Sequence, residues 1–547
     1  MKDIYIDIME RALRAYGDAR IHAYFDEVRT GGITEHGFPR LVANLAVLLA
    51  HGRCGAYRDL CEEGFDLCCR DMPRGGVAND FSVREIFTAL REVRDHGVFP
   101  PTRVEGWIGA FAAFDPRVGY DIVTDWYESR GNWAAFAAAS EITRRNVCGG
   151  GAPEFTDRQI SSLLGDFDDS GMYRDPHEPI LYDHMTRVVL QYLLREGYDG
   201  RYRGCIERHL DRAAALSLRM QSVSGEMPYG GRSHQFLFNA TVLAAEFEYS
   251  AARWWATGDT VRAGEYKAAA KRAVENLLPW LEEPVHHVKN RYPVSSRIGC
   301  ENYAYFNKYM ITLASNAYLA YLFADDRVVP TEAPCDRGGF SAVTSPYFHK
   351  VMANAGGYYA EFDTAADTAY DANGLGRIQR RGMPDTLCLS VPFPPAGGNY
   401  RTERENPGAM SFCVYRKTAD GIYCGADVRW RFCLCDREES PGAVVLTFLH
   451  TIGDRTVAER YRVSPEGVCA EVEAGEEYGF FVPVLAYDGA TESVIREEKG
   501  RITCTYRVHT CSFTFDGTPE GYTVYYNRNG RYRVYRIPAQ RVHITME

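Results

Sequence analysis

Four segments in the first part of the chain gather side chains that could bind a carboxylate or move a proton. They are 129–133 (SRGNW), 173–187 (YRDPHEPILYDHMTR), 225–236 (GEMPYGGRSHQF) and 297–310 (RIGCENYAYFNKYM). Arginine binds a carboxylate through two hydrogen bonds, and histidine and tyrosine can accept and donate protons near neutral pH. Asparagine can stabilise a carboxyl oxygen as charge develops on it. These residue types together suit β-elimination from a uronic acid, in which the proton beside the carboxylate leaves and the 4-linked sugar departs. The candidate site residues are Asn132, Trp133, Asp175, Glu178, Tyr182, His184, Glu226, Tyr229, Arg232, His234, Arg297, Glu301, Tyr303, Tyr305 and Lys308.

The same segments also contain carboxylates, which leave a second reaction open. A pair of acids on opposite sides of a glycosidic bond would hydrolyse it, and Glu226, Asp175 and Glu178 are the first candidates. The alternative function is therefore a glycoside hydrolase, an exo-glucuronidase. A second alternative is a glycan-binding protein without catalysis. The site needs no metal or other cofactor for elimination, and we expect none.

Individual residues also have purely structural interpretations. Asn132 could simply cap a helix, His184 could be a hydrogen-bonded histidine between helices, and Arg232 could pair with a neighbouring acid across a tight turn. A functional interpretation of Arg232 is also possible, because the glycines of segment 225–236 let the backbone pass close to a ligand. The start of the long helix that follows favours an anion. We expect this segment to lie on the rim of a cleft.

The elements that must position these residues are helices. Apolar residues recur at helical spacing in 38–52, 132–146, 179–200, 232–259 and 303–326, joined by polar, Gly-rich or Pro-rich connections. Several of these helices are apolar on more than one face and so need cover on several sides. Two concentric layers of helices would provide it. Loops leading into the inner helices would then meet at one rim, and all four segments precede or open helices.

The pattern changes after residue 325. A Pro/Gly-rich linker, 326–340, is followed by short alternating runs rich in Val, Tyr, Thr and Phe, and NRNGRY is a hairpin signal. The sequence thus predicts an α+β protein of more than one domain. Residues 1–325 form a helical catalytic domain and 341–547 an antiparallel β-sandwich.

Composition narrows the function classes. The net charge of −11 has no clustered basic face, which argues against nucleic-acid binding. No run approaches the length needed to span a bilayer, and the N-terminus lacks the features of a signal peptide. The 16 cysteines show no regular framework, which is typical of free thiols in a reducing compartment. We expect a cytoplasmic enzyme acting on imported oligosaccharides, without membrane partners. A homodimer is compatible with the sequence.

The whole chain resembles the α/α-toroid polysaccharide lyases of the heparinase, chondroitin lyase and alginate lyase type, together with related toroid families of poorly defined function. The stretches RGNWAAF, PILYDHMTRVVLQYLL, MPYGGRSHQFLFNA and HKVMANAGGYYAEFDTAADTAYDANGLGRI carry the resemblance. It implies an incomplete barrel of helical hairpins followed by the β-sandwich, and a site built from Asn, His, Tyr and Arg.

The resemblance also implies a role for individual residues. Asn132 would neutralise the carboxylate, and Arg232 would grip it. His234 would be the base, with His184 as its rival, and Tyr303 or Tyr229 the acid. This chain lacks the His-rich segment with which heparinase-type β domains often hold structural zinc.

Overall fold

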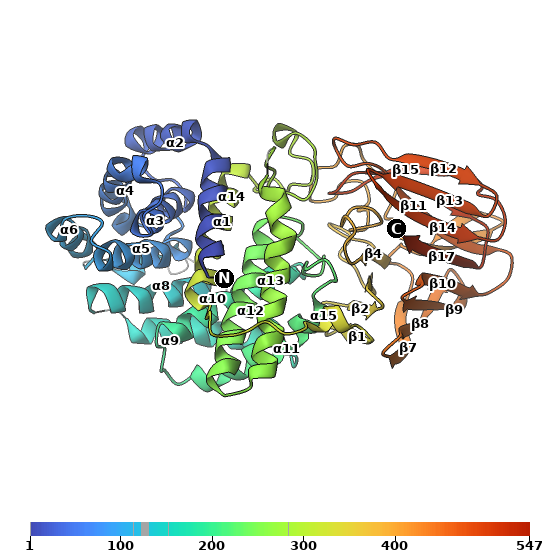
Figure 1. The fold of residues 1–547 in the computed structure, drawn as a ribbon, viewed down its shortest axis with the longest axis horizontal. Coiled ribbons are helices and arrows are strands. Elements are labelled where there is room, and N and C mark those ends of the chain that lie inside the picture. Colours follow the sequence, from blue (N-terminus) through green and yellow to red (C-terminus); the bar gives the residue numbers. More distant parts are fainter. Residues whose placement is uncertain (1, 113, 122–130, 151, 283) are drawn as a thin grey trace.

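The structure is a computed structural model, and it describes residues 2–112, 114–121, 131–150, 152–282 and 284–547. The helices and the strands form two bodies side by side along the long axis of the molecule (Figure 1). Each body has its own hydrophobic core: one extends through the helices and the other lies between the sheets. The change from helix to strand falls between the end of α14 at Phe323 and the start of β1 at Phe340.

The helical body has long helices joined by short connections. Its helices are α1 (Asp3–Tyr16), α2 (Asp18–Gly31), α3 (Gly37–Ala50), α4 (Arg58–Asp71), α5 (Val83–Asp95), α6 (Pro101–Ala112), α7 (Pro116–Gly119), α8 (Trp133–Cys148), α9 (Pro153–Leu163), α10 (Ile180–Arg195), α11 (Arg203–Met220), α12 (Phe238–Ala256), α13 (Thr260–Leu277), α14 (Phe306–Phe323) and the short α15 (Pro334–Arg337).

Six of the described helices form an inner ring. α3 packs on α5, α5 on α8, α8 on α10, α10 on α12, α12 on α14, and α14 again on α3. The contact between α14 and α3 closes the ring, where the resemblance implied an incomplete barrel. Other helices cover it from outside, among them α1 on α14, α4 on α3, α9 on α8 and α13 on α12. The fold is therefore the α/α toroid expected from the sequence.

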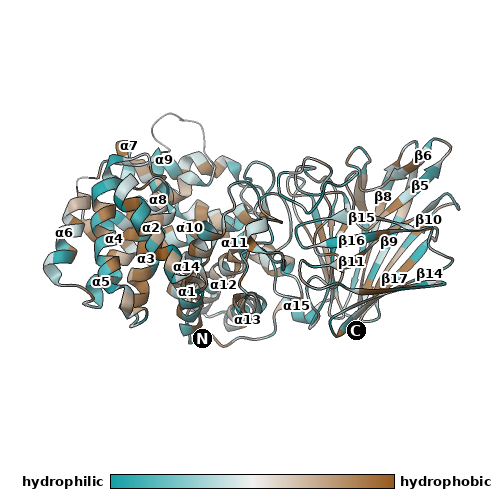
Figure 2. Cartoon of the chain, turned by 90° about the horizontal axis from the view of Figure 1, so that it is seen from above, coloured by the Kyte–Doolittle hydropathy of each residue, from teal (hydrophilic) through white to brown (hydrophobic). Residues whose placement is uncertain are grey.

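Burial explains this order. The inner helices α3, α12 and α14 are buried along most of their length and on all sides, whereas outer helices such as α2 and α11 bury one face only. A helix that is apolar all round must be enclosed by other helices. Figure 2 shows the hydrophobic colour concentrated within the helical body, with hydrophilic residues toward its outside.

The second body consists of antiparallel sheets. The strands are β1 (Phe340–Val343), β2 (Lys350–Ala355), β3 (Tyr358–Asp363), β4 (Gly374–Arg380), β5 (Cys413–Thr418), β6 (Gly421–Cys424), β7 (Phe432–Ser440), β8 (Ala443–Ile452), β9 (Arg455–Ser464), β10 (Gly467–Glu473), β11 (Tyr478–Tyr487), β12 (Val494–Glu498), β13 (Arg501–Tyr506), β14 (His509–Phe515), β15 (Tyr522–Tyr526), β16 (Arg531–Ile537) and β17 (Arg541–Met546). They form sheets in the orders β1-β2-β3-β4, β12-β13-β14-β17-β10-β9-β8-β7 and β15-β16-β11-β5-β6.

The local signals that predicted strands and turns are confirmed. The segment NRNGRY connects β15 and β16, which pair in antiparallel register with Tyr526 opposite Arg531. The loop before β4 joins the two bodies, because Asp371 accepts a hydrogen bond from the backbone of Gly231 at 2.8 Å. Within the described ranges, no helix combines the length and the apolar character needed to cross a bilayer.

Candidate active site

A cavity of about 400 Å³ lies at the N-terminal ends of the six inner helices. Each of these helices supplies lining residues from its first turns or from the loop just before it. The lining residues are Glu35, His36 and Arg40 at α3, Ala78 and Phe81 before α5, Asn132, Trp133 and Phe136 at α8, Tyr182 and Met185 in α10, Arg232 and Phe238 at α12, and Tyr303, Lys308, Tyr309 and Thr312 at α14. The loops into the inner helices thus meet at one rim, as the sequence predicted.

The cavity favours anions. Helix N-termini carry partial positive charge, and those of the inner helices converge here. Arg40, Arg232 and Lys308 add full charges, while Glu35 is the one carboxylate that lines this cavity among the described residues. Burial lowers the pKa of Lys308, and its ammonium lies 4.0 Å from the carboxylate of Glu35.

Arg40 adds to the positive potential from the base of the cavity. Its guanidinium lies 3.1 Å from Glu85, and the same carboxylate accepts a hydrogen bond from Arg84 at 2.9 Å. Two buried guanidinium groups therefore share one carboxylate. Burial and the charge of Arg84 lower the pKa of Arg40.

Arg232 is held in place from two sides. Its guanidinium forms an ion pair with Asp175, and it lies 4.5 Å from the centre of the Tyr182 ring. Burial raises the pKa of Asp175, whereas Arg232 and the backbone amide of Asn132 lower it. Arg232 both pairs with a neighbouring acid and lines the cavity, with 27% of its side chain exposed. Arg232 therefore has the acid partner of the structural interpretation and the position at the rim that the functional interpretation requires.

Ser233 connects the tyrosines of the site. Its hydroxyl lies 3.0 Å from the hydroxyl of Tyr303 and 3.4 Å from that of Tyr182. Its backbone amide donates to Glu301 at 2.6 Å, and its φ of 60° is left-handed, an uncommon conformation outside glycine. Burial raises the pKa of Tyr303, so this phenol holds its proton at neutral pH.

His36 is a second group able to move a proton. It lines the cavity directly before α3, beside the ring of Phe81 at 5.1 Å. Burial and the charges of Arg40 and Lys308 hold the pKa of its imidazole well below the usual value. Its Nδ1 is buried without a hydrogen-bond partner among the described residues. A neutral imidazole in this position is available as a proton acceptor near pH 7.

Aromatic side chains form much of the remaining wall. Trp133, Phe81, Phe136, Phe238 and Tyr309 present apolar surface to the cavity. The side chain of Asn132, which could have been a helix cap only, makes no capping hydrogen bond to α8 and lines the cavity instead. A few polar groups among apolar walls are typical of small-molecule sites.

A neighbouring cavity of about 420 Å³ shares Glu35 and Lys308 with this site. Tyr16, Arg20 and Tyr24 line it on the side of α1 and α2, and Tyr305 lines it on the side of α14. The two cavities therefore adjoin at the side chains of Glu35 and Lys308.

The structure does not place His234 in the cavity, contrary to its predicted role as the base. Only 1% of its side chain is exposed, and it lies between the two bodies, 3.6 Å from Asp371 and 3.2 Å from Arg528. Burial and the charge of Arg528 lower its pKa to about 4. Next to Ser233 in sequence, it faces the β body because the chain turns sharply there.

Two further candidates are one layer removed from the cavity. Asp175 reaches it only through Arg232, and Glu301 supports Ser233 while pairing with Arg528 at 2.7 Å. Tyr305 lines the neighbouring cavity, with the guanidinium of Arg297 4.6 Å from its ring. Arg297 itself donates to the carbonyl oxygen of Asn302 at 2.6 Å and lines neither cavity.

The remaining candidates are structural in this fold. His184 is fully buried and bonds Glu246 between α10 and α12, the alternative that the sequence left open. Glu226 forms a buried ion pair with Lys289, whose charge helps to lower the pKa of Glu226 to about 2. Tyr229 is fully buried, with the ammonium of Lys350 3.7 Å from its ring.

Glu178 connects the bodies. Its carboxylate lies 2.6 Å from Nε2 of His349, a residue of the β body. Glu178 therefore does not line the cavity, and neither do His184, Glu226 and Tyr229. The carboxylate pair expected for hydrolysis from Glu226, Asp175 and Glu178 does not meet there.

Glu35, His36 and Arg40 also line the cavity, and they are not among the residues predicted from the sequence. The sequence does carry a signal for them: the polar residues of ITEHGFPR, 33–40, precede or open an inner helix, just as the four chosen segments do. Within the described part of the chain, no group of three or more His, Cys, Asp or Glu residues is arranged to hold a metal ion.

No family model matches this chain, and no curated protein matches it. Solved structures with similar architecture include a chondroitin AC lyase from Streptomyces coelicolor A3 (12% identity, 100% of this chain and 82% of that one, TM-score 0.46). Heparan sulfate lyase HepC from Pedobacter heparinus is another (11% identity, 92% and 76%, TM-score 0.41). A glycosyl hydrolase of family 88 from Bacteroides vulgatus is a third (11% identity, 59% of this chain and 99% of that one, TM-score 0.38). Lyases and a glycosyl hydrolase both occur among these structures.

Proposed function

We propose that the protein cleaves uronate-containing oligosaccharides by β-elimination. The observation that carries this proposal is the charge of the cavity: the N-termini of the inner helices converge on it, and Arg40, Arg232 and Lys308 face one lining carboxylate, Glu35, among the described residues. Such a site favours a carboxylate-bearing sugar. It also stabilises the negative charge that develops when the proton beside that carboxylate is removed.

His36 and Tyr303 are the groups we assign to proton transfer. The neutral imidazole of His36 takes the proton from C5 of the uronate, because its pKa is held low by burial. The electron pair of that C–H bond forms the C4–C5 double bond, and the C4–O bond breaks. Tyr303, whose hydroxyl is oriented by Ser233, gives its proton to the departing oxygen.

Arg232 and Asn132 bind the substrate carboxylate in this scheme. Arg232 is oriented by Asp175 and by the ring of Tyr182, so little conformational freedom is lost when it binds a ligand. Trp133 offers an apolar face beside them for the sugar ring. The neighbouring cavity, lined by Tyr305, would accept the adjoining sugar units.

The product distinguishes elimination from hydrolysis. The protein is incubated in ¹⁸O-labelled water with oligosaccharides that contain glucuronate or galacturonate. Elimination gives a 4,5-unsaturated uronate that absorbs in the ultraviolet and takes no label. A saturated, labelled product would refute elimination and favour the exo-glucuronidase, with Glu35 as the first carboxylate to replace. Binding without any product would favour the glycan-binding alternative.

Variants test the assigned roles. Loss of a general acid or base costs about 10²–10⁴-fold in rate, so Tyr303→Phe and His36→Ala should each lower kcat by this amount without changing the melting temperature greatly. Tyr321→Phe is a matched control, because Tyr321 lies near the other end of α14 and lines no part of the cavity. Equal activity of Tyr303→Phe and Tyr321→Phe would refute the assignment of the acid.

A further inference from the structure

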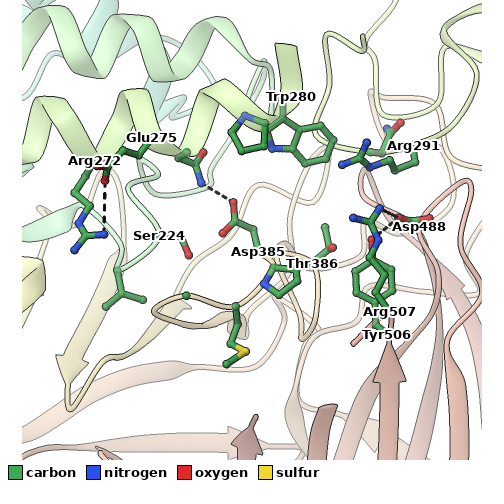
Figure 3. Close-up of a pocket in the computed structure, with 17 residues that line it drawn as sticks. Ser224, Arg272, Glu275, Trp280, Arg291, Asp385, Thr386, Asp488, Tyr506 and Arg507 are labelled. Carbon is green, nitrogen blue, oxygen red and sulfur yellow. Dashed lines mark hydrogen bonds and ion pairs between the residues drawn. The ribbon is translucent and has the colours of Figure 1, made fainter. Parts of the chain in front are cut away.

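A second cavity of about 400 Å³ lies between the two bodies and shares no lining residue with the active-site cavity. Trp280 and Arg291 line it from the helical body, and Asp385 and Thr386 from the loop after β4. Figure 3 shows Trp280 above that loop, with Arg272 and Glu275 on one side and Arg507 and Asp488 on the other.

Arg291 is a cation that forms no ion pair with a carboxylate among the residues that the structure describes. Its guanidinium lies 4.8 Å from the centre of the Trp280 ring, and no carboxylate of the described residues lies within ion-pair distance of it. Its backbone amide donates to the carbonyl oxygen of Asp488 at 2.9 Å, which fixes the start of the side chain at the cavity wall. A stacked guanidinium of this kind is suited to bind an anionic group.

Arg507 adds a second, weakly paired cation. Its nearest carboxylate is Asp488, 3.8 Å away. That carboxylate already accepts hydrogen bonds from Tyr506 and from the backbone amide of Thr491. Arg507 therefore competes for an acceptor that is largely satisfied, and its charge remains available to a ligand.

The opposite wall offers further hydrogen-bonding groups. Asn276 donates to Asp385 at 2.7 Å, and Thr386 lies next to Asp385 on the same loop. Burial and the charge of Glu226 raise the pKa of Asp385 to about 6. Amide, hydroxyl and weakly acidic carboxyl groups in this arrangement can exchange hydrogen bonds with sugar hydroxyls.

We propose that this interdomain cavity is a second saccharide-binding site, which takes a sugar unit bearing a carboxylate. Arg291 and Arg507 bind the carboxylate, Trp280 supplies the apolar face, and Asn276 and Asp385 bind the hydroxyl groups. The site is independent of the proposed reaction, since none of its residues belongs to the active-site cavity.

Fluorine NMR can report the two cavities separately. The chain has 7 tryptophans; Trp280 lines the interdomain cavity and Trp133 the active-site cavity. The protein is labelled with 5-fluorotryptophan, and Trp280→Phe and Trp133→Phe assign the two resonances. It is then titrated with D-glucuronate and D-galacturonate, and with D-glucose as the neutral control.

We expect at least one of the two uronates to shift the Trp280 resonance with a Kd on the order of 1 mM, about −4 kcal/mol, and glucose to leave it unchanged. Arg291→Gln should weaken this binding about tenfold or more, because a charge-assisted hydrogen bond is lost. Arg262→Gln is the matched control: Arg262 also lies over a tryptophan, Trp254 at 4.0 Å, but lines neither cavity.

Several results would overturn the proposal. They are a Trp280 resonance that neither uronate shifts, an equal shift with glucose, or a shift that persists in Arg291→Gln. A shift confined to Trp133 would place uronate binding in the active-site cavity alone. Conversely, if no oligosaccharide is cleaved but Trp280 still responds to uronate, the proposed reaction fails and the second site stands.

Discussion

Replacing Arg232 by alanine tests the carboxylate-binding part of the site most directly. In the intact protein its guanidinium pairs with Asp175, stacks on Tyr182 and lines the cavity. Alanine removes the cation from both the substrate and Asp175. The side chain of Asp175 is only 2% exposed, so the substitution affects stability as well as activity, and the two effects must be measured separately.

The activity loss follows from the interaction that disappears. A hydrogen bond to a charged group contributes about 1.5–3 kcal/mol, which corresponds to roughly 10- to 150-fold in kcat/KM. The stability loss is smaller than for a fully buried pair, because 27% of the Arg232 side chain is exposed and Asp175 can take up a proton. Its pKa is already raised by burial, and losing Arg232 raises it further. We expect a loss of about 1–3 kcal/mol in the free energy of unfolding.

The assay compares an oligosaccharide uronate with its methyl ester. Arg232→Ala should lower kcat/KM for the acid much more than for the ester, because the ester carries no charge to bind. Asp175→Asn in addition should restore stability, since it removes the unpaired acid, but not activity on the acid. Equal losses on acid and ester, or recovery of activity in the double variant, would refute the assignment of Arg232 as the carboxylate-binding residue.

Three further predictions concern pH and backbone geometry. The pKa of His36 is lowered, so kcat/KM should stay constant from neutral pH down to well below 6.5 and fall only when His36 is protonated. A fall in kcat/KM centred at pH 6.5 or above would contradict the assignment of His36 as the base. The pKa of His349, which lies between Asp363 and Glu178, is raised to about 9. Its contribution to the free energy of unfolding is complete below about pH 6.5 and should be lost as the pH rises through 9. Denaturant unfolding should detect this loss in the intact protein and not in His349→Gln. Gly231→Ala should lower the melting temperature, because φ is 66° and the new Cβ would lie 2.6 Å from a backbone oxygen; an unchanged value would show that the loop can shift.

The fold could be predicted from the sequence because its signals are local. Helices that are apolar all round require an outer layer, and alternating runs with turn residues between them predict antiparallel strands. Closure of the ring could not be predicted, because it depends on the contact between α14 and α3, which lie far apart in sequence. No periodicity within either helix reports whether the first and last helices of a ring meet.

The site was predictable in part for the same reason. Residues that open inner helices line the cavity, and Asn132, Tyr182, Arg232 and Tyr303 follow this rule. His234 does not, although it lies two residues after Arg232. Sequence position alone cannot say which side of an irregular loop faces the cavity, because the left-handed φ at Ser233 redirects the chain between these neighbours.

The β body supports the cavity without lining it. Arg528, in the loop between β15 and β16, donates to Glu301 at 2.7 Å, and Glu301 accepts from the backbone of Ser233 at 2.6 Å. Ser233 in turn lies 3.0 Å from the hydroxyl of Tyr303. Arg528 of the β body thus fixes Ser233 through two hydrogen bonds that meet at Glu301, and Ser233 orients Tyr303, the proposed acid.

A second connection reaches Arg232, the proposed carboxylate-binding residue. The hydroxyl of Tyr347, before β2, donates to the backbone carbonyl of Asp175 at 2.5 Å, and Asp175 holds Arg232. One connection ends at Tyr303, the proposed acid, and the other at Arg232, the proposed carboxylate-binding cation. Because both depend on buried contacts between the bodies, the helical body alone would retain the residues of the cavity but lose the geometry that aligns them. The β body is therefore part of the framework that holds the candidate active site, rather than a separate module.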